Sequence, residues 1–146
     1  MCSSAVIVER RTLHERARRP DMHRFPHPSG ADRVRPLVLL TGSSGRIGRA
    51  VADRLRHRYQ VIGLDRQGNP RSVPEMESIC VDLTDEESVR CGLERVRFAY
   101  GDRVASVVHL AAYYDFSGEP SPLYEEVTVR GTERLLRALR RQAFSV

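Results

Sequence analysis

Lysine is absent from this sequence of 146 residues, so all 24 of its permanently basic side chains are arginines. No catalytic scheme that needs a lysine can be carried by this chain. Long apolar runs are absent too, since no stretch approaches the roughly 20 apolar residues of a transmembrane helix. The N-terminus has neither the apolar core nor the cleavage site of a secretory signal. With 40% hydrophobic and 29% charged residues, the composition is that of a soluble globular protein of one domain.

Cysteine is scarce, and its three positions, Cys2, Cys80 and Cys91, form no Cys-x-x-Cys pair. We therefore expect neither a disulfide framework nor a zinc site. We expect a cytoplasmic location. We predict that Cys80 is a small buried apolar residue. His23 and His27 are four residues apart, but Pro26 lies between them, so a helical metal-binding pair is not expected.

Most of the net charge of +5 lies in the first quarter of the chain. Residues 1–36 hold eight arginines and four acids, which gives +4. Prolines interrupt any helix there, so we predict that residues 1–35 form a basic, disordered leader. The alternative is a contact with nucleic acid or an acidic membrane surface. We do not favour it, because the segment lacks interleaved aromatic residues and a recognisable binding motif.

From residue 36 onward, short apolar runs alternate with helical patterns. The apolar runs are residues 37–40, 60–64, 78–81 and 104–110. Unbroken apolar strands that alternate with helices predict an α/β fold with a parallel sheet covered on both faces. We therefore predict a Rossmann-type three-layer sandwich over residues 36–146, with strand order 3-2-1-4.

Three helices are predicted between and after these strands. The first spans residues 46–58, with Ile47, Val51 and Leu55 facing inward. The second follows a capping box in which the Thr84 hydroxyl accepts from the amide of Glu87. The third starts at Ser121-Pro122, with serine as N-cap and proline at the first helical position, and continues at least to Leu139.

The strongest functional signal is the sequence Thr-Gly-Ser-Ser-Gly-Arg-Ile-Gly at residues 41–48, between a predicted strand and a predicted helix. Gly42 allows a tight turn, Gly45 lets the backbone approach a pyrophosphate, and Gly48 lets the helix pack closely on the sheet. The helix N-terminus then favours the negative charge of the phosphates. The predicted cofactor contacts here are Gly42, Ser44, Gly45, Arg46, Ile47 and Gly48.

Asp65 ends the next predicted strand, 23 residues after Gly42. A carboxylate at that place can accept hydrogen bonds from both hydroxyls of the adenosine ribose, and it repels a 2′-phosphate. This favours NAD over NADP as the cofactor. Arg66 argues the other way, because a neighbouring arginine can accept a 2′-phosphate.

Together these residues resemble the extended short-chain dehydrogenases/reductases, in the NAD-dependent epimerase/dehydratase family. Its Asp-Leu pair after the third strand, which flanks the adenine, matches Asp82-Leu83. Its His-Leu-Ala-Ala at the end of the fourth strand lies under the cofactor and matches residues 109–112. The resemblance thus adds Leu110, Ala111 and Ala112 as cofactor contacts, and it extends over about residues 36–142. A later helix motif is also present, although the family's asparagine is Thr128 here.

The family's catalytic Tyr-x-x-x-Lys is missing from this sequence, so no catalytic residue is assigned. We expect a domain incomplete at its C-terminus: the NAD-binding portion of an epimerase/dehydratase-type oxidoreductase. In full length it would transfer hydride on a sugar nucleotide or similar alcohol, and a homodimer is one expectation for that form. The alternative is a non-catalytic dinucleotide-binding or redox-sensing module.

Two further groups of residues are left open by the sequence. His109 is interpreted as a packed strand-end residue held by a hydrogen bond, with a catalytic base as the weaker alternative. The aromatic residues Tyr113, Tyr114 and Phe116 either border the nicotinamide or substrate, or simply pack their own loop.

Overall fold

The computed structural model describes residues 35–66 and 76–146. The predicted basic leader, up to residue 34, and the pair His23 and His27 lie outside the described residues. Within the described part, four strands form one sheet in the order β3-β2-β1-β4, and every neighbouring pair is parallel. The strands are β1 (Leu37–Thr41), β2 (Gln60–Asp65), β3 (Glu77–Cys80) and β4 (Ser106–His109). The predicted parallel sheet and its strand order are confirmed.

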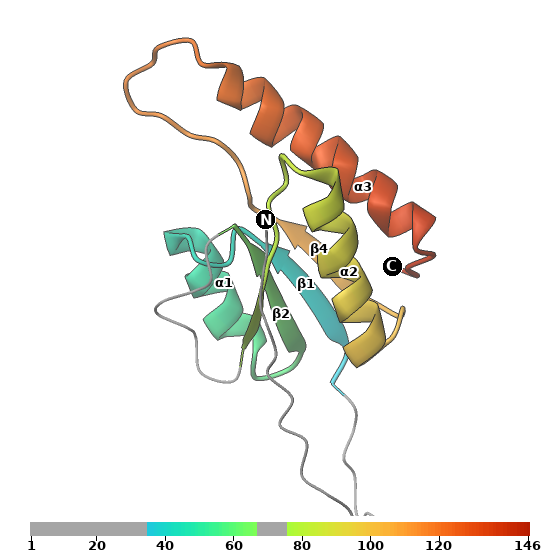
Figure 1. Ribbon diagram of the computed structural model, residues 1–146. Helices are drawn as coiled ribbons and strands as arrows, with labels where there is room; N and C mark the ends of the chain where they lie inside the picture. The colour runs from blue at the N-terminus through green and yellow to red at the C-terminus, as the bar shows by residue number, and fades with distance from the viewer. Residues whose placement is uncertain (1–34, 67–75) are drawn as a thin grey trace, which may run out of the picture. The chain divides into compact units, whose positions relative to one another are not determined.

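Helices cover both faces of this sheet, as Figure 1 shows. One face carries α1 (Arg46–Leu55), and the other carries α2 (Glu86–Tyr100) and α3 (Gly131–Arg141). A π-helical segment, η1 (Tyr124–Arg130), leads directly into α3. The three-layer α/β sandwich predicted from the sequence is therefore confirmed.

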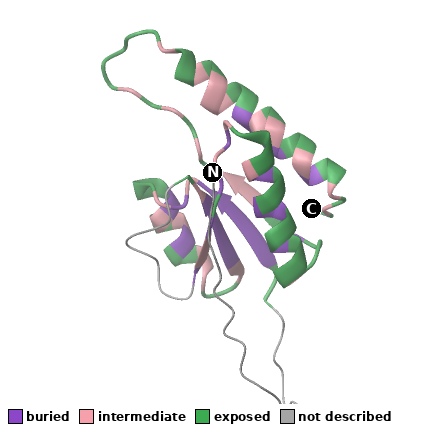
Figure 2. Ribbon diagram, viewed as in Figure 1, coloured by how far each residue is buried: buried purple, intermediate pink, exposed green. Residues whose placement is uncertain are grey.

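The core lies on both sides of the central strand β1, whose side chains alternate between the two faces. Leu39 packs into the cluster under α2 and α3, and its neighbour Leu40 packs into the cluster under α1. Both are completely buried, and Figure 2 shows β1 and β2 mainly in the colour of buried residues. Two buried faces explain why β1 is a continuous apolar run rather than an alternating one.

The prediction for the inward face of α1 is wrong at its first position. Ile47 is 70% exposed, while Gly48 and Ala52 are the buried residues of the helix. The reason is a close backbone contact: a Cβ built on Gly48 would lie 2.1 Å from the carbonyl oxygen of Gly42. The glycine must face the turn, which rotates the helix and leaves Ile47 outward.

The predicted capping box of α2 is also wrong. Asp85 is the N-cap, and its carboxylate accepts from the amide of Glu87 at 2.9 Å. The Thr84 hydroxyl instead donates to Oδ1 of Asp82 at 2.7 Å. A carboxylate is the stronger acceptor for that hydroxyl, and the helix therefore starts one residue later.

The C-terminal segment agrees with the sequence at its start and differs afterwards. Ser121 Oγ accepts from the amide of Leu123 at 3.3 Å, as predicted for an N-cap. The following π-helical residues were not predicted. After α3, Ser145 forms a parallel bridge with Arg103, so the last residues of the chain begin to pair beside the start of β4.

Ser43 contributes an unfavourable term to this core. Its side chain is fully buried, and its Oγ has no hydrogen-bond partner among the described residues. Replacing Ser43 by alanine removes a desolvated hydroxyl, so the free energy of unfolding should rise by about 1 kcal/mol. Chemical denaturation measures the change, with Ser44→Ala as the less buried control. A loss of stability in Ser43→Ala would mean that the hydroxyl is bonded after all.

Candidate functional site

The residues predicted to bind the cofactor gather at the carboxyl ends of the strands. In a parallel sheet these ends share one edge, and the register places Thr41 beside Leu64 and His109. Asp65 of β2 pairs with Cys80 of β3 at the same edge. The glycine turn, Asp65, Asp82-Leu83 and residues 110–112 therefore follow four adjacent strands. Open α/β sheets bind their ligands at this edge, where the strand order reverses.

Gly42 connects the turn to the strands on both sides of β1. Its φ is +69°, a conformation that favours glycine, and a Cβ there would lie 2.8 Å from the amide nitrogen of Ala111. Its own amide donates to the carbonyl of Leu64 at 3.0 Å. The turn then closes with a bond from the amide of Gly45 to the carbonyl of Gly42 at 3.1 Å.

The N-terminus of α1 has no side-chain cap. Gly45 is its N-cap and provides no side-chain hydrogen bond, and the first turn has no acidic residue. Gly45, Arg46 and Ile47 are exposed to solvent. By contrast, α2 has the Asp85 cap and two acids, Glu86 and Glu87, in its first turn. Only α1 of these two helices presents donors and a positive dipole end to an external anion, so the residues present fit a pyrophosphate.

Asp65 lies next to the glycine turn and is held against it. Its Oδ2 accepts a hydrogen bond from the amide of Ser44 at 3.0 Å. The carboxylate therefore stands beside the glycine turn, at the end of β2. This is the relation that a ribose-binding carboxylate needs to a phosphate-binding turn.

Asp82 is a partly buried carboxylate after β3. Burial by itself raises its pKa, but bonds from the Thr84 amide and hydroxyl, with the charges of Arg66 and Arg134, outweigh burial and lower the pKa of Asp82. The group is thus ionised at neutral pH. Both Thr84 bonds reach Oδ1, and the adjoining Leu83 is buried.

The prediction that Cys80 is buried is wrong. Its side chain is exposed, and its thiol donates to the carbonyl oxygen of Arg66 at 3.3 Å. The residue ends β3, an outer strand of the four described ones, so no strand covers its far side.

His109 joins two strands and a helix through hydrogen bonds. Thr41 Oγ1 accepts from the amides of Leu110 and Ala111 at 3.1 and 3.2 Å. Its single proton is then donated to Nδ1 of His109, 2.6 Å away. Nε2 therefore carries the proton of the neutral ring and donates to Thr132 Oγ1 at 2.9 Å. The predicted role of His109 as a hydrogen-bonded strand-end residue agrees with this network.

Burial lowers the pKa of His109 below its usual value near 6.5. As pH falls below about 6.5, the unfolded chain takes up a proton that the folded chain resists, so stability is lost. The free energy of unfolding should fall more steeply between pH 7 and pH 5 in the wild type than in His109→Gln, by at most about 1.4 kcal/mol per pH unit. Exposed His57→Gln is the control, and equal slopes in wild type and His109→Gln would rule out this contribution.

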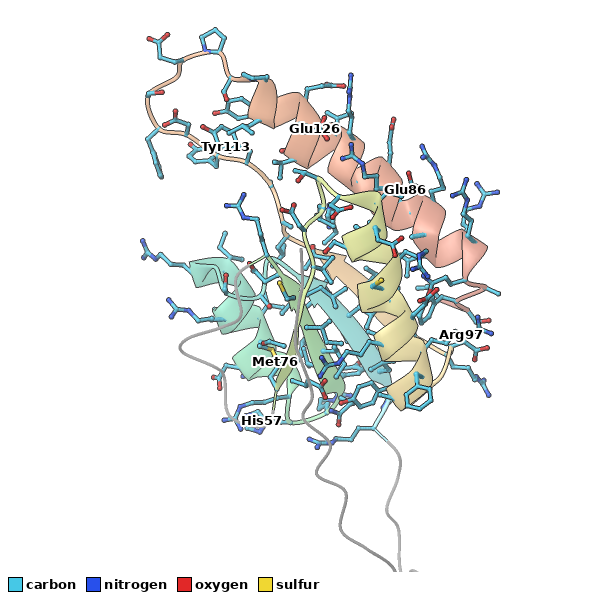
Figure 3. The ribbon with its side chains drawn as sticks, viewed as in Figure 1. His57, Met76, Glu86, Arg97, Tyr113 and Glu126 are labelled. Carbon is cyan, nitrogen blue, oxygen red and sulfur yellow. The ribbon has the colours of Figure 1, made fainter. Side chains whose placement is uncertain are left out.

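The loop after β4 separates the three aromatic residues that the sequence left together. Tyr113 packs edge-on against Tyr124, with ring centroids 4.9 Å apart, and Figure 3 shows it beside the start of the C-terminal helix. Its amide donates to Thr128 Oγ1 at 3.1 Å, so Thr128 anchors the loop. Tyr114 and Phe116 are largely exposed. Packing against the following helix therefore explains the position of Tyr113, but it does not explain the positions of Tyr114 and Phe116.

Sequence reasoning missed Tyr124 as a part of this loop. Its hydroxyl accepts from the amide of Asp115 and donates to the carbonyl of the same residue, both at 3.2 Å. No local signal marks this contact, because it depends on a π-helical turn that places the ring. Within residues 35–66 and 76–146, no group of three or more His, Cys, Asp or Glu is placed to hold a metal ion, and no helix is long and apolar enough to cross a membrane.

The fold and this edge define a dinucleotide-binding α/β protein. The model of the NAD dependent epimerase/dehydratase family matches residues 38–146, and the chain belongs to that family. NAD is the cofactor of this family by its description, and the chain is an NAD-binding member of it. The resemblance inferred from the motifs is thus confirmed.

Individual relatives agree with this assignment. An NAD-dependent glucose-6-phosphate dehydrogenase of Haloferax volcanii is 36% identical over 90 residues, covering 58% of this chain and 29% of that protein. A UDP-glucose 4-epimerase of Thermus thermophilus, solved in complex with NAD, is 31% identical with a TM-score of 0.61, covering 75% and 35% of the two chains. A uronate dehydrogenase of Agrobacterium tumefaciens shares the fold at 23% identity and a TM-score of 0.57, covering 73% and 36%. The chain thus spans about a third of the length of these relatives.

Proposed function

We propose that the carboxyl edge binds NAD through the glycine turn and Asp65, and that the whole protein is an NAD-dependent oxidoreductase acting on a sugar or sugar-nucleotide alcohol. The observation that carries the proposal is the uncapped N-terminus of α1 beside a carboxylate fixed by the Ser44 amide. When bound, NAD supplies the group that accepts or returns the hydride.

Each predicted residue has a proposed part in holding the dinucleotide. The turn residues Gly42, Ser44 and Gly45 and the first residues of α1, Arg46, Ile47 and Gly48, surround the pyrophosphate. Asp65 accepts hydrogen bonds from the hydroxyls of the adenosine ribose. Residues 82–83 border the adenine, and residues 110–112 lie under the remaining half of the cofactor. His109 acts here as a positioning residue, because its ring bonds both Thr41 and Thr132.

The substrate class rests on two relatives, whose names refer to glucose 6-phosphate and UDP-glucose. Both names contain a sugar with an oxidisable alcohol, so we extend that class to the whole protein. No observation favours the non-catalytic, redox-sensing alternative. A homodimer and a cytoplasmic location are part of the proposal.

Asp65 is the residue that tests the cofactor preference. Asp65→Asn keeps an oxygen for the Ser44 amide but removes the charge that binds ribose hydroxyls and repels a 2′-phosphate. NAD should bind about tenfold more weakly, and the preference for NAD over NADP should narrow. Isothermal titration of both cofactors measures this, with Asp53→Asn on the exposed side of α1 as the control. Unchanged discrimination would remove Asp65 from the ribose role.

A further inference from the structure

The segment between β4 and η1 presents two aromatic rings to solvent. In Figure 1 this segment extends beyond the carboxyl ends of the strands before the chain returns in η1. Tyr114 is 71% exposed and Phe116 is 92% exposed, and their ring centroids lie 4.7 Å apart at an interplanar angle of 80°. The rings pack on each other and not on the core, which makes the pair a candidate contact surface.

The pair is presented by a segment with its own hydrogen bonds. Asp115, between the two aromatic residues, is bonded through its backbone to the Tyr124 hydroxyl. Its carboxylate accepts from the amide of Ser117 at 3.0 Å and from the Ser117 hydroxyl at 2.7 Å. Because the residue between the rings is bonded on both its backbone and its side chain, the exposure of the rings is a property of the folded segment.

The location of the pair connects it with the proposed substrate side. The segment follows Ala112 directly, and Thr128 anchors its first residue, Tyr113. The adenosine half of a dinucleotide lies toward β2 and β3, so the reactive half lies toward β4. The aromatic pair therefore stands on the side of the cofactor where a substrate is expected.

The same segment contains no basic residue, although the chain as a whole is rich in arginine. No arginine occurs between Arg103 and Arg130, although the whole sequence has 24, and the interval holds four acids. Glu125 and Glu126 form ion pairs with arginines of η1 and α3.

The other two acids, Asp115 and Glu119, have no ion pair among the described residues. Hydrogen bonds from the Ser117 amide and hydroxyl lower the pKa of Asp115, so it is ionised at neutral pH. Asp115 and Glu119 therefore add negative charge to the segment that carries the aromatic pair, and no arginine of this segment offsets it.

We infer that Tyr114 and Phe116 receive an uncharged, hydroxyl-bearing sugar ring, and that this segment discriminates against rings that carry a carboxylate, as in sugar acids. The C–H face of a sugar ring is weakly positive and packs on the negative face of an aromatic ring. Carboxylates of the segment can accept hydrogen bonds from the sugar hydroxyls but repel an anion. The inference rests on the proposed function and narrows its substrate class.

A matched pair of probes tests this on the NAD-saturated full chain. Methyl β-D-glucopyranoside and methyl β-D-glucopyranosiduronic acid differ only in whether C6 is an alcohol or a carboxylate. Saturation-transfer NMR titrations should show the neutral glucoside binding, and the acid binding roughly two- to fivefold more weakly at low salt. The difference should shrink at high salt, because salt screens the repulsion. Equal or tighter binding of the acid, or no binding of the glucoside, would overturn the inference.

Variants assign the binding to the aromatic pair. The double variant Tyr114→Ala, Phe116→Ala should lose most of the glucoside signal, whereas Phe98→Ala should keep it; Phe98 is 96% exposed on α2, away from this segment. Glu119→Arg should abolish or reverse the discrimination against the acid. The inference is overturned if the double variant still binds the glucoside. It is also overturned if the double variant loses self-association in sedimentation instead of glucoside binding, because the pair would then contact a second copy of the chain. NAD titration of the same samples separates failure of the proposed function, in which NAD does not bind, from failure of this inference alone.

Discussion

Replacing Gly48 by alanine is expected to lower the free energy of unfolding by about 3 kcal/mol. The added Cβ would lie 2.1 Å from the carbonyl oxygen of Gly42 and 2.9 Å from Cα of Ser43. Both neighbours are backbone atoms of the glycine turn, which cannot rotate away as a side chain can. Either α1 must move from the sheet or the turn must open, and urea denaturation followed by circular dichroism measures the loss.

Gly131→Ala is the matched control for this prediction. Gly131 is also helical, but the nearest atom to its added Cβ would be Cβ of Leu83 at 3.1 Å, compared with 2.1 Å for the nearest atom at Gly48. Alanine is the better helix former by roughly 0.5–1 kcal/mol, which offsets the tight contact, so little net change is expected. If Gly48→Ala were as mild as Gly131→Ala, close packing of α1 on the turn would not be the reason for this glycine.

Gly45→Asp should separate binding from folding. Gly45 has an extended backbone with φ −67°, which any residue adopts, and it is the N-cap of α1. Aspartate is a favoured N-cap, so stability should change by less than about 1 kcal/mol even though the added Cβ lies 3.2 Å from the Gly42 carbonyl. The new carboxylate would occupy the helix amides and repel a pyrophosphate, and NAD should bind about a hundredfold more weakly.

Gly45→Asn is the control for charge, because asparagine has nearly the same shape and also caps helices. Its loss of NAD affinity should be clearly smaller than that of Gly45→Asp. Calorimetric titration of both variants with NAD, after thermal unfolding has shown them folded, gives the comparison. Equal affinity in wild type and Gly45→Asp would mean that the phosphates bind elsewhere.

The fold and the edge of the sheet that carries the proposed cofactor site were predictable from the sequence, because the local sequence patterns agree there with the topology of the sheet. β1 is a continuous apolar run that ends in a turn needing Gly42, and such a run predicts a buried parallel strand. Asp65 and Asp82 follow two further strands, so parallel topology alone brings them to the same edge. The strand order then follows from the reversal that open α/β sheets share.

What the sequence did not predict depends on competition between contacts. Ile47 matched the helical period, but the approach of Gly48 to the turn sets the face of α1. Thr84 matched a capping box, but Asp82 takes its hydroxyl. The π-helical turn that brings Tyr124 to Asp115 has no periodicity to reveal it. At Ile47 and Tyr124 a contact with a more distant part of the chain overrides the local preference. At Thr84 the competing contact is itself local, since Asp82 is two residues away.

The central claim is that the carboxyl edge of this sheet binds NAD through the glycine turn and Asp65. The most direct measurement is isothermal titration of NAD, and separately of NADP, into the folded wild-type chain. We predict saturable binding of NAD at one site and weaker binding of NADP. If neither cofactor binds the folded chain, or if NADP binds more tightly than NAD, the claim is contradicted.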